Sequence, residues 1–321
     1  MEWCAHIAGA SDLEGELSPA RLAGFEPSGT LRPALELTVR LIEERFGGVR
    51  FSRGAFGNEF CEHLLPAPRV LEEARAAVRA RGLAFTFLTP YASDTGIRAL
   101  RELLPVLDGD EVVFNDWGVL NLLRRDFPGL TPVQGRLLNK SLRDPRVMGL
   151  YAEAPANGPA GAATLDALRR SSADCESYTG LLARFGVDIL EMDSLPQGMD
   201  FSFAARGVRV GVSLPFGFVS TSRVCMAAGL HYAKPEKFQP GAPCRHECQT
   251  HLVEYTYTNS PFANRDQKFL LKGNTYFYSH TAAMLRRLLE QAAHGEIHRL
   301  TFQPRLPMSS APGGSGNGMC A

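Results

Sequence analysis

Residues 83–138, with the sequence LAFTFLTPYASDTGIRALRELLPVLDGDEVVFNDWGVLNLLRRDFPGLTPVQGRLL, carry the pattern that decides the fold. Short apolar runs alternate there with stretches of helical spacing. The expected strands are 83–88, 111–115 and 130–138, and the expected helices are 94–107 and 116–127. This alternation is typical of parallel strands that are joined by right-handed crossovers.

The same rhythm continues on both sides of this stretch. Upstream, PRVLEEARAAVRARG at 68–82 begins with proline, carries arginines in its last turn and ends on glycine, which predicts an amphipathic helix. Downstream, strands are expected at 187–192, 208–219 and 296–302, with a helix at 280–294. An α/β domain of the (β/α) TIM-barrel type fits this pattern and length better than an open sheet.

Composition sets the expected limits of the domain. Residues 1–33 have little periodicity, and 31–46 are expected to form a helix that ends at Gly47-Gly48. Together, 1–46 are expected to form an N-terminal extension, so the barrel is placed at 47–305 and a short strand is expected at 49–52. The segment 143–172 contains the run AEAPANGPAGAA and is expected to be an insertion. The small, polar residues of 306–321 predict a disordered tail.

The charge balance bears on possible partners. Lys and Arg together number 34, as do Asp and Glu, and the pI is about 7.1. A neutral chain has no broad basic face for nucleic acid, so nucleic acid is not expected as a partner and a small-molecule substrate is. No run of about 18 apolar residues and no signal-peptide pattern occurs, which predicts a cytoplasmic protein without a membrane span.

The cysteines are the most informative residue type. Four of the seven lie in predicted loops or at strand ends: Cys61, Cys225, Cys244 and Cys248. The last two form a C-x3-C within GAPCRHEC, a spacing that lets two thiolates face one metal centre. The other three are expected to take no part in such a site, because Cys4 and Cys320 lie in segments that are expected to be mobile and Cys175 lies in a predicted helix.

Two kinds of metal centre suit these four cysteines. Zinc with three or four thiolates is one, and nearby histidines could replace a cysteine: His231, His246 and His251. An iron–sulfur cluster held by loops at one barrel face is the other. The residues alone leave both open, together with four unrelated thiols and a Cys61/His63 catalytic pair.

Polar residues at the predicted strand ends are candidates for a substrate pocket: Asn115, Asp116, Gln134 and Asn139, together with Arg223. Helix capping is the alternative role for Asp94 and Asp116. A local basic group could bind an anionic substrate or form a solvated face: Arg136, Lys140, Arg143 and Arg146. No G-x-S-x-G or H-E-x-x-H motif occurs, so nothing in the residues supports a peptidase mechanism.

Two separated segments carry a resemblance to a known family. EVVFNDWGVLNLLRRDFPGLTPVQGRLLN at 111–139 and SLPFGFVSTSRVC at 213–225 resemble the collagenase-like peptidase family (peptidase U, family thirty-two, or U32). Within that family the cysteine layout is most similar to that of the UbiV-like ubiquinone-biosynthesis iron–sulfur proteins. FLLKGNT at 269–275 is similar to the family's late strand.

This resemblance implies a role for the cysteines and for the whole chain. Cys61, Cys225, Cys244 and Cys248 would bind a [4Fe-4S] cluster, with zinc as the alternative cofactor. The chain would be a subunit of an oxygen-independent hydroxylase, paired with a UbiU-like partner subunit in a heterodimer. Its substrate would be a small molecule such as a quinone precursor, and prephenate is the implied oxygen source. A zinc-stabilised, non-catalytic scaffold and a peptidase stay as alternatives.

Overall fold

The computed structural model describes residues 1–26, 28–144, 158–234, 236–238, 243–256 and 268–309. Eight parallel strands close into a barrel, which confirms the predicted TIM-barrel-type α/β fold. In order around the barrel they are β1 (Glu2–Ile7), β12 (Arg299–Phe302), β7 (Arg209–Leu214), β6 (Ile189–Asp193), β5 (Thr131–Gln134), β4 (Glu111–Phe114), β3 (Ala84–Leu88) and β2 (Arg53–Gly57).

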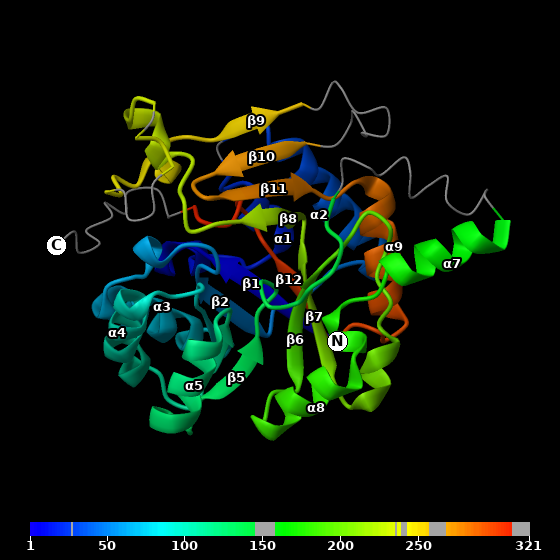
Figure 1. Cartoon of the computed structure of the whole chain (residues 1–321), viewed down its shortest axis with the longest axis horizontal. Coiled ribbons are helices and arrows are strands. Elements are labelled where there is room, and N and C mark those ends of the chain that lie inside the picture. The colour runs from blue at the N-terminus through cyan, green and yellow to red at the C-terminus, as the bar shows by residue number, and fades with distance from the viewer. Residues whose placement is uncertain (27, 145–157, 235, 239–242, 257–267, 310–321) are drawn as a thin grey trace.

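Helices surround the barrel (Figure 1). They are α1 (Pro19–Ala23), α2 (Arg32–Phe46), α3 (Pro68–Ala80), α4 (Asp94–Leu103), α5 (Trp117–Asp126), α7 (Gly158–Leu168), α8 (Glu176–Arg184) and α9 (Ala282–Ala293). The expected cap of α5 is confirmed, because the Asp116 carboxylate accepts a hydrogen bond from the N–H of Gly118 at 2.7 Å. Ser93, not Asp94, caps α4, so that expectation was one residue off.

A second sheet covers one end of the barrel. Its four antiparallel strands lie in the order β8 (Phe216–Thr221), β11 (Thr275–Ser279), β10 (Phe269–Lys272) and β9 (Val253–Tyr255). Because β8 follows β7 directly, this sheet lies over the carboxyl ends of the barrel strands (Figure 1). The ring of Phe60, in the loop after β2, packs edge-on against Phe218 and Phe277 at 5.5 and 5.0 Å. The sheet therefore shares one core with the barrel.

The structure corrects the expected N-terminal boundary. Residues 1–46 are not an extension, because β1 pairs with both β12 and β2 and closes the barrel. The strand expected at 49–52 lies instead at Arg53–Gly57. Of the expected tail, Leu306 and Met308 are buried, whereas 310–321 lie outside the described residues. Of the expected insertion, 145–157 lie outside them too, and 158–168 form α7.

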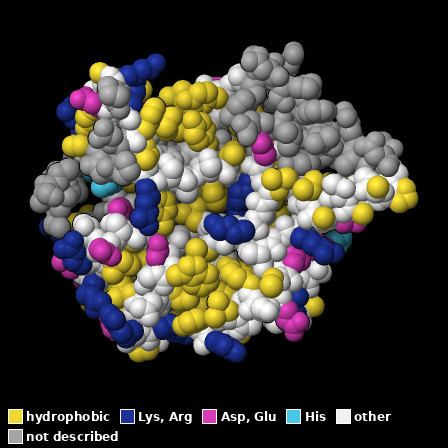
Figure 2. Space-filling model, in the orientation of Figure 1, with side chains coloured by type: hydrophobic (Ala, Val, Ile, Leu, Met, Phe, Trp, Pro, Cys, Tyr) yellow, Lys and Arg dark blue, Asp and Glu magenta, His cyan; other side chains and the backbone are white. Residues whose placement is uncertain are grey.

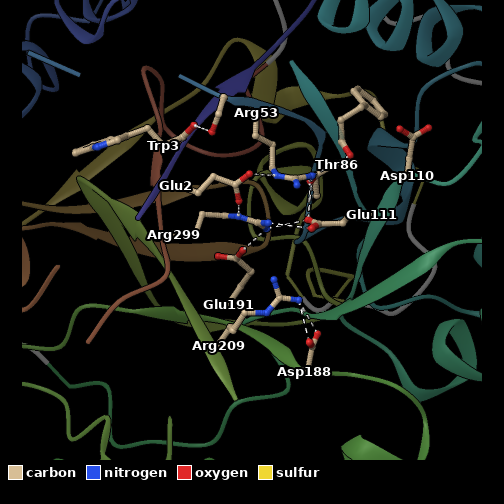
Figure 3. A network of polar contacts seen from close by, with 12 residues as sticks. Glu2, Trp3, Arg53, Thr86, Asp110, Glu111, Asp188, Glu191, Arg209 and Arg299 are labelled. Carbon is tan, nitrogen blue, oxygen red and sulfur yellow. Dashed lines mark hydrogen bonds and ion pairs between the residues drawn. The ribbon is translucent and has the colours of Figure 1, made fainter. Parts of the chain in front are cut away.

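Five charged side chains fill the amino-terminal end of the barrel (Figure 3). Arg299 Nε lies 2.6 Å from a Glu2 carboxylate oxygen, and its Nη1 lies 2.9 Å from Glu111 and 3.3 Å from Glu191. Arg53 binds the other oxygen of Glu2 at 2.9 Å and Glu111 at 3.2 Å. Two guanidinium groups among three carboxylates leave one negative charge in excess, in a layer where Arg299 and Glu191 are buried and the other three side chains are partly exposed.

That excess makes Glu191 sensitive to pH. Burial raises the pKa of Glu191 to about 7; Arg299 opposes this, and Glu59 and Glu111 add to it. Since the folded pKa lies above the unfolded value of 4.5, the folded state binds the proton more tightly and loses stability as pH rises between these values. Glu191→Gln removes this loss. The free energy of unfolding of the variant minus that of wild type, measured with urea, should be roughly 1–3 kcal/mol larger at about pH 8 than at about pH 5. An equal difference at both pH values would contradict this account.

Among the described residues, no helix has the length and apolar character needed to cross a membrane. The face seen in Figure 2 carries hydrophobic side chains over the second sheet and over α5 and β5, with basic side chains between them. Trp117, at the start of α5, is 42% exposed, and β9 contributes exposed Val253 and Tyr255.

Candidate functional site

Cys61 lies in a loop that Asn58 shapes. The Asn58 side-chain oxygen accepts hydrogen bonds from the N–H groups of Phe60 and Cys61 at 2.8 and 2.9 Å, and its amide donates to the Cys61 carbonyl at 2.9 Å. This pattern is an asparagine-stabilised turn. Because it follows β2, it puts the thiol at the carboxyl end of the barrel, beneath the second sheet.

The turn between β10 and β11 connects the cysteine-bearing loops. The Asn274 amide donates to the carbonyl oxygens of Phe60 at 2.8 Å and Ser222 at 2.7 Å. The carbonyl of Gly273 accepts from the N–H of Ala227 at 3.2 Å. A Cβ at Gly273 would lie 3.2 Å from that of Cys248, so the backbone approaches this cysteine closely. Segments that bear Cys61, Cys225 and Cys248 therefore meet at this turn.

Hydrogen-bond donors point at three of the four sulfur atoms. The N–H of Ala228 lies 3.4 Å from Cys225 Sγ, and the N–H of His246 lies 3.4 Å from Cys244 Sγ. The side-chain amide of Gln249 lies 3.2 Å from Cys248 Sγ. Donors to sulfur stabilise thiolates and adjust the properties of a metal that they bind.

The four thiols influence one another. Burial raises the pKa of Cys61 to about 12; the N–H of His63 opposes this, and the other three cysteines add to it. Burial likewise raises the pKa of Cys244 to about 11, with contributions from Cys248 and Cys225. Deprotonating four neighbouring thiols needs a compensating positive charge, which a bound metal centre supplies. The donor set therefore fits a thiolate-ligated metal group.

The same residues do not form a ready site for one ion. Within the described part of the chain, no three side chains of His, Cys, Asp or Glu converge closely enough to hold a single metal ion. Two of the histidines have other partners: His231 Nε2 lies 3.1 Å from Glu247 Oε1, and His251 Nδ1 lies 3.1 Å from the Glu247 carbonyl. Among the described residues, the four cysteines therefore do not form a ready site for a single metal ion.

The remaining cysteines have different surroundings. Cys4 lies in β1 and is buried in the barrel wall, so the expectation that it lies in a mobile end was wrong. Cys175 is exposed at the start of α8. Cys320 falls outside the described residues.

Most of the expected pocket residues make local contacts. The Asn115 amide donates to the Thr89 carbonyl at 2.8 Å, and its oxygen accepts from the N–H of Leu137 at 3.0 Å. Asp116 caps α5. These two residues thus join the ends of neighbouring strands to the following segments, and a contact with substrate stays a prediction.

Gln134, Asn139 and Arg223 differ in exposure. The Tyr178 hydroxyl donates to Gln134 Oε1 at 2.6 Å, and Ser172 Oγ donates to Asn139 Oδ1 at 3.1 Å, but the NH₂ groups of both buried amides have no hydrogen-bond partner among the described residues. Arg223 is exposed, with its guanidinium carbon 5.7 Å from the centre of the Tyr91 ring. Of the five residues, Arg223 is the one whose charge is open to solvent beside the cysteine-bearing loops.

A buried ion-pair network at the carboxyl end of the barrel was missed at the sequence level. Arg136 is fully buried; its Nε donates to Glu59 at 2.8 Å and its Nη1 to Asp193 at 2.8 Å. Arg143 also pairs with Asp193. Burial alone would lower the pKa of Arg136, but Glu59 and Asp193 raise it above its usual range. Arg136 and Arg143 are thus neither a solvated face nor free to bind an anion, and Arg146 lies outside the described residues.

His280 is a second residue that no sequence motif indicates. It is 2% exposed, and neither ring nitrogen has a hydrogen-bond partner among the described residues. Burial lowers its pKa to about 4, Asp193 opposes this shift, and Arg136 adds to it. The ring is therefore neutral near pH 7, next to the Arg136 network.

Comparison with known proteins gives a likeness of fold. No protein-family model matches the chain, and no curated protein matches it. The U32 peptidase Mk0906 has a TM-score of 0.39 and 11% identity, covering 94% of this chain and 92% of that one. A phosphodiesterase of Oleispira antarctica, solved with sn-glycerol-3-phosphate, has a TM-score of 0.34 and 10% identity over 66% and 83%. A family 18 N-acetylglucosaminidase of Paenibacillus barengoltzii has a TM-score of 0.32 and 10% identity over 94% of both chains.

Proposed function

We propose that Cys61, Cys225, Cys244 and Cys248 hold a [4Fe-4S] cluster in a U32-like, UbiV-like protein. The observation that carries this proposal is the meeting of the segments that bear Cys61, Cys225 and Cys248 at the β10–β11 turn. Burial raises the pKa values of Cys61 and Cys244, and the neighbouring thiols add to both shifts. Donors aimed at three of the sulfur atoms support it further.

Zinc and a [4Fe-4S] cluster make different demands on the positions of four thiols. Zinc binds four sulfurs at about 2.3 Å each, so all four must approach one point. In a cubane each thiolate binds a different iron atom, so the sulfurs lie farther apart. The described residues include no group suited to a single ion, yet they include four thiols that interact. The larger, four-iron centre accommodates both observations.

We further propose that the chain is a subunit of an oxygen-independent hydroxylase that acts on a small molecule such as a quinone precursor, with a UbiU-like partner. This part rests on the sequence resemblance. A bound cluster supplies one-electron transfer, and it can supply Lewis acidity at an iron with an exchangeable ligand. Arg223 would bind an anionic substrate, because its exposed charge lies over Tyr91, whose hydroxyl accepts from Asn274 at 2.9 Å.

Removing the C-x3-C pair tests the ligand assignment. In Cys244→Ala/Cys248→Ala we expect iron to fall from about four atoms per chain to almost none, and absorption near about 400 nm to be lost. Circular dichroism should still report the barrel, because both residues lie outside its strands. The matched control is Cys175→Ala, which removes an exposed thiol and should keep its iron. Full iron content in the double variant would contradict the assignment.

The hydroxylase role needs a separate measurement. Cluster-loaded protein and its partner are incubated without oxygen with an aromatic quinone precursor and prephenate, and products are examined by mass spectrometry. The proposal predicts a product heavier by one oxygen atom. An unchanged precursor, in a reaction whose cluster stays intact, would contradict this role and leave the ligand assignment standing.

A further inference from the structure

Lys272 is a buried cation next to the cysteines. It is the last residue of β10, pairs with Thr275 across the turn and is only 8% exposed. Gly273 follows it, and a Cβ there would lie 3.8 Å from Cys248 Sγ. The backbone at Lys272 and Gly273 therefore lies close to the Cys248 sulfur atom.

Two negatively charged groups act on the ammonium group of Lys272. Among the described residues it makes no hydrogen bond or ion pair, and Cys248 and Glu26 are the two groups whose negative charge acts on it. Burial lowers the pKa of Lys272, and these two groups oppose that shift. Because most of the Lys272 side chain is buried, a negative charge close to it stabilises the charged form.

A cluster with four thiolate ligands would supply that negative charge. Four thiolates carry four negative charges, and the oxidised [4Fe-4S] core carries two positive ones, so the centre as a whole is anionic. Reduction by one electron makes it more negative still. A fixed cation next to the ligand sulfur stabilises the reduced state more than the oxidised state.

We infer that Lys272 sets the reduction potential of the cluster, holding it higher than the four thiolates alone would. This inference rests on the proposed cluster. A unit charge about 10 Å away, at an effective dielectric constant of about 20, changes a one-electron equilibrium roughly tenfold. Removing the Lys272 charge should therefore lower the ratio of reduced to oxidised cluster about tenfold at a fixed potential, a shift of ~59 mV to more negative values.

Replacing Glu26 tests the same electrostatic effect, with an expected shift of the reduction potential in the opposite direction. It follows α1, is 5% exposed and accepts a hydrogen bond from the N–H of Ser28 at 3.0 Å. Its carboxylate is the counter-charge that partly offsets Lys272. Glu26→Gln should therefore shift the potential to more positive values, whereas Lys272→Met shifts it to more negative values.

The experiment is a redox titration of the full chain, purified without oxygen. Dithionite supplies the electron through small-molecule mediators, and the electron paramagnetic resonance signal of the reduced cluster reports the ratio. Lys272→Met is compared with Lys272→Arg, which keeps the charge, and with Lys268→Met. Lys268 precedes β10, pairs with Glu254 and is 49% exposed, so its removal should leave the potential unchanged.

The outcomes separate this inference from the proposed function. A wild-type potential in Lys272→Met with a full complement of iron would overturn the role of Lys272 and leave the cluster standing. Equal shifts in Lys272→Met and Lys272→Arg would also overturn it, because the charge is then not the cause. Wild-type protein without iron would instead overturn the proposed function itself.

Discussion

Replacing Arg136 with Met is expected to lower the free energy of unfolding by about 3–5 kcal/mol. The guanidinium is fully buried and binds Glu59 and Asp193, each at 2.8 Å. Both carboxylates are themselves buried, so the variant leaves Glu59 without its cation and Asp193 with Arg143 alone. Methionine fills much of the volume but donates no hydrogen bond.

Urea unfolding of the variant measures this loss, and Arg209→Met is the matched control. Arg209 binds Asp188 at 2.9 Å, but both side chains are about half exposed, at 45% and 53%. Exposed pairs contribute roughly 0–1 kcal/mol, so the control should unfold almost like wild type. Equal losses in the two variants would contradict the view that burial makes the Arg136 network important.

The second large effect is expected from Gly57→Ala, at the end of β2. The residue has φ of 112°, a conformation that side chains with a Cβ rarely adopt. A Cβ there would lie 2.4 Å from the carbonyl oxygen of Leu88, which is backbone of the adjacent strand β3 and cannot rotate away. Strain and clash together should cost roughly 2–4 kcal/mol.

Gly47→Ala separates the clash from the strain. Gly47 also has a positive φ, of 71°, but no atom of the described residues lies within 4 Å of its Cβ position at the end of α2. Its replacement should cost only about 1 kcal/mol, measured by the same urea unfolding. Gly57→Ala also displaces the loop that starts at Asn58 and bears Cys61, so we expect it to lower iron content as well. A Gly57→Ala protein as stable as the control would contradict the reported packing.

Much of the barrel could be predicted because its helices and strands carry local signals. The helix expected at 68–82 is α3, since its apolar residues Leu71, Ala74 and Val78 recur at helical spacing. β1 was missed, because EWCAHI stands alone at the start of the chain and pairs only with strands far away in sequence. The expected strand at 208–219 is two strands, β7 and β8, because the chain passes there from the barrel to the second sheet.

Part of the candidate site could be predicted from local sequence, and part depends on contacts between distant segments. Cysteine spacing is local, so four candidate ligands could be selected from the sequence. Which loops meet depends on tertiary structure: Asn274 contacts Phe60 across 214 residues, and Arg136 contacts Glu59 across 77. Lys272 belongs to an apolar strand sequence, FLLK, and nothing in that sequence indicates that the lysine is buried near Cys248.

Metal and sulfide analysis of the wild-type chain, purified without oxygen, decides whether the four cysteines hold an iron–sulfur cluster. We expect about four iron atoms and four inorganic sulfides per chain, with broad absorption near about 400 nm that dithionite bleaches. A colourless protein that holds one tightly bound zinc ion, or no metal, would contradict it.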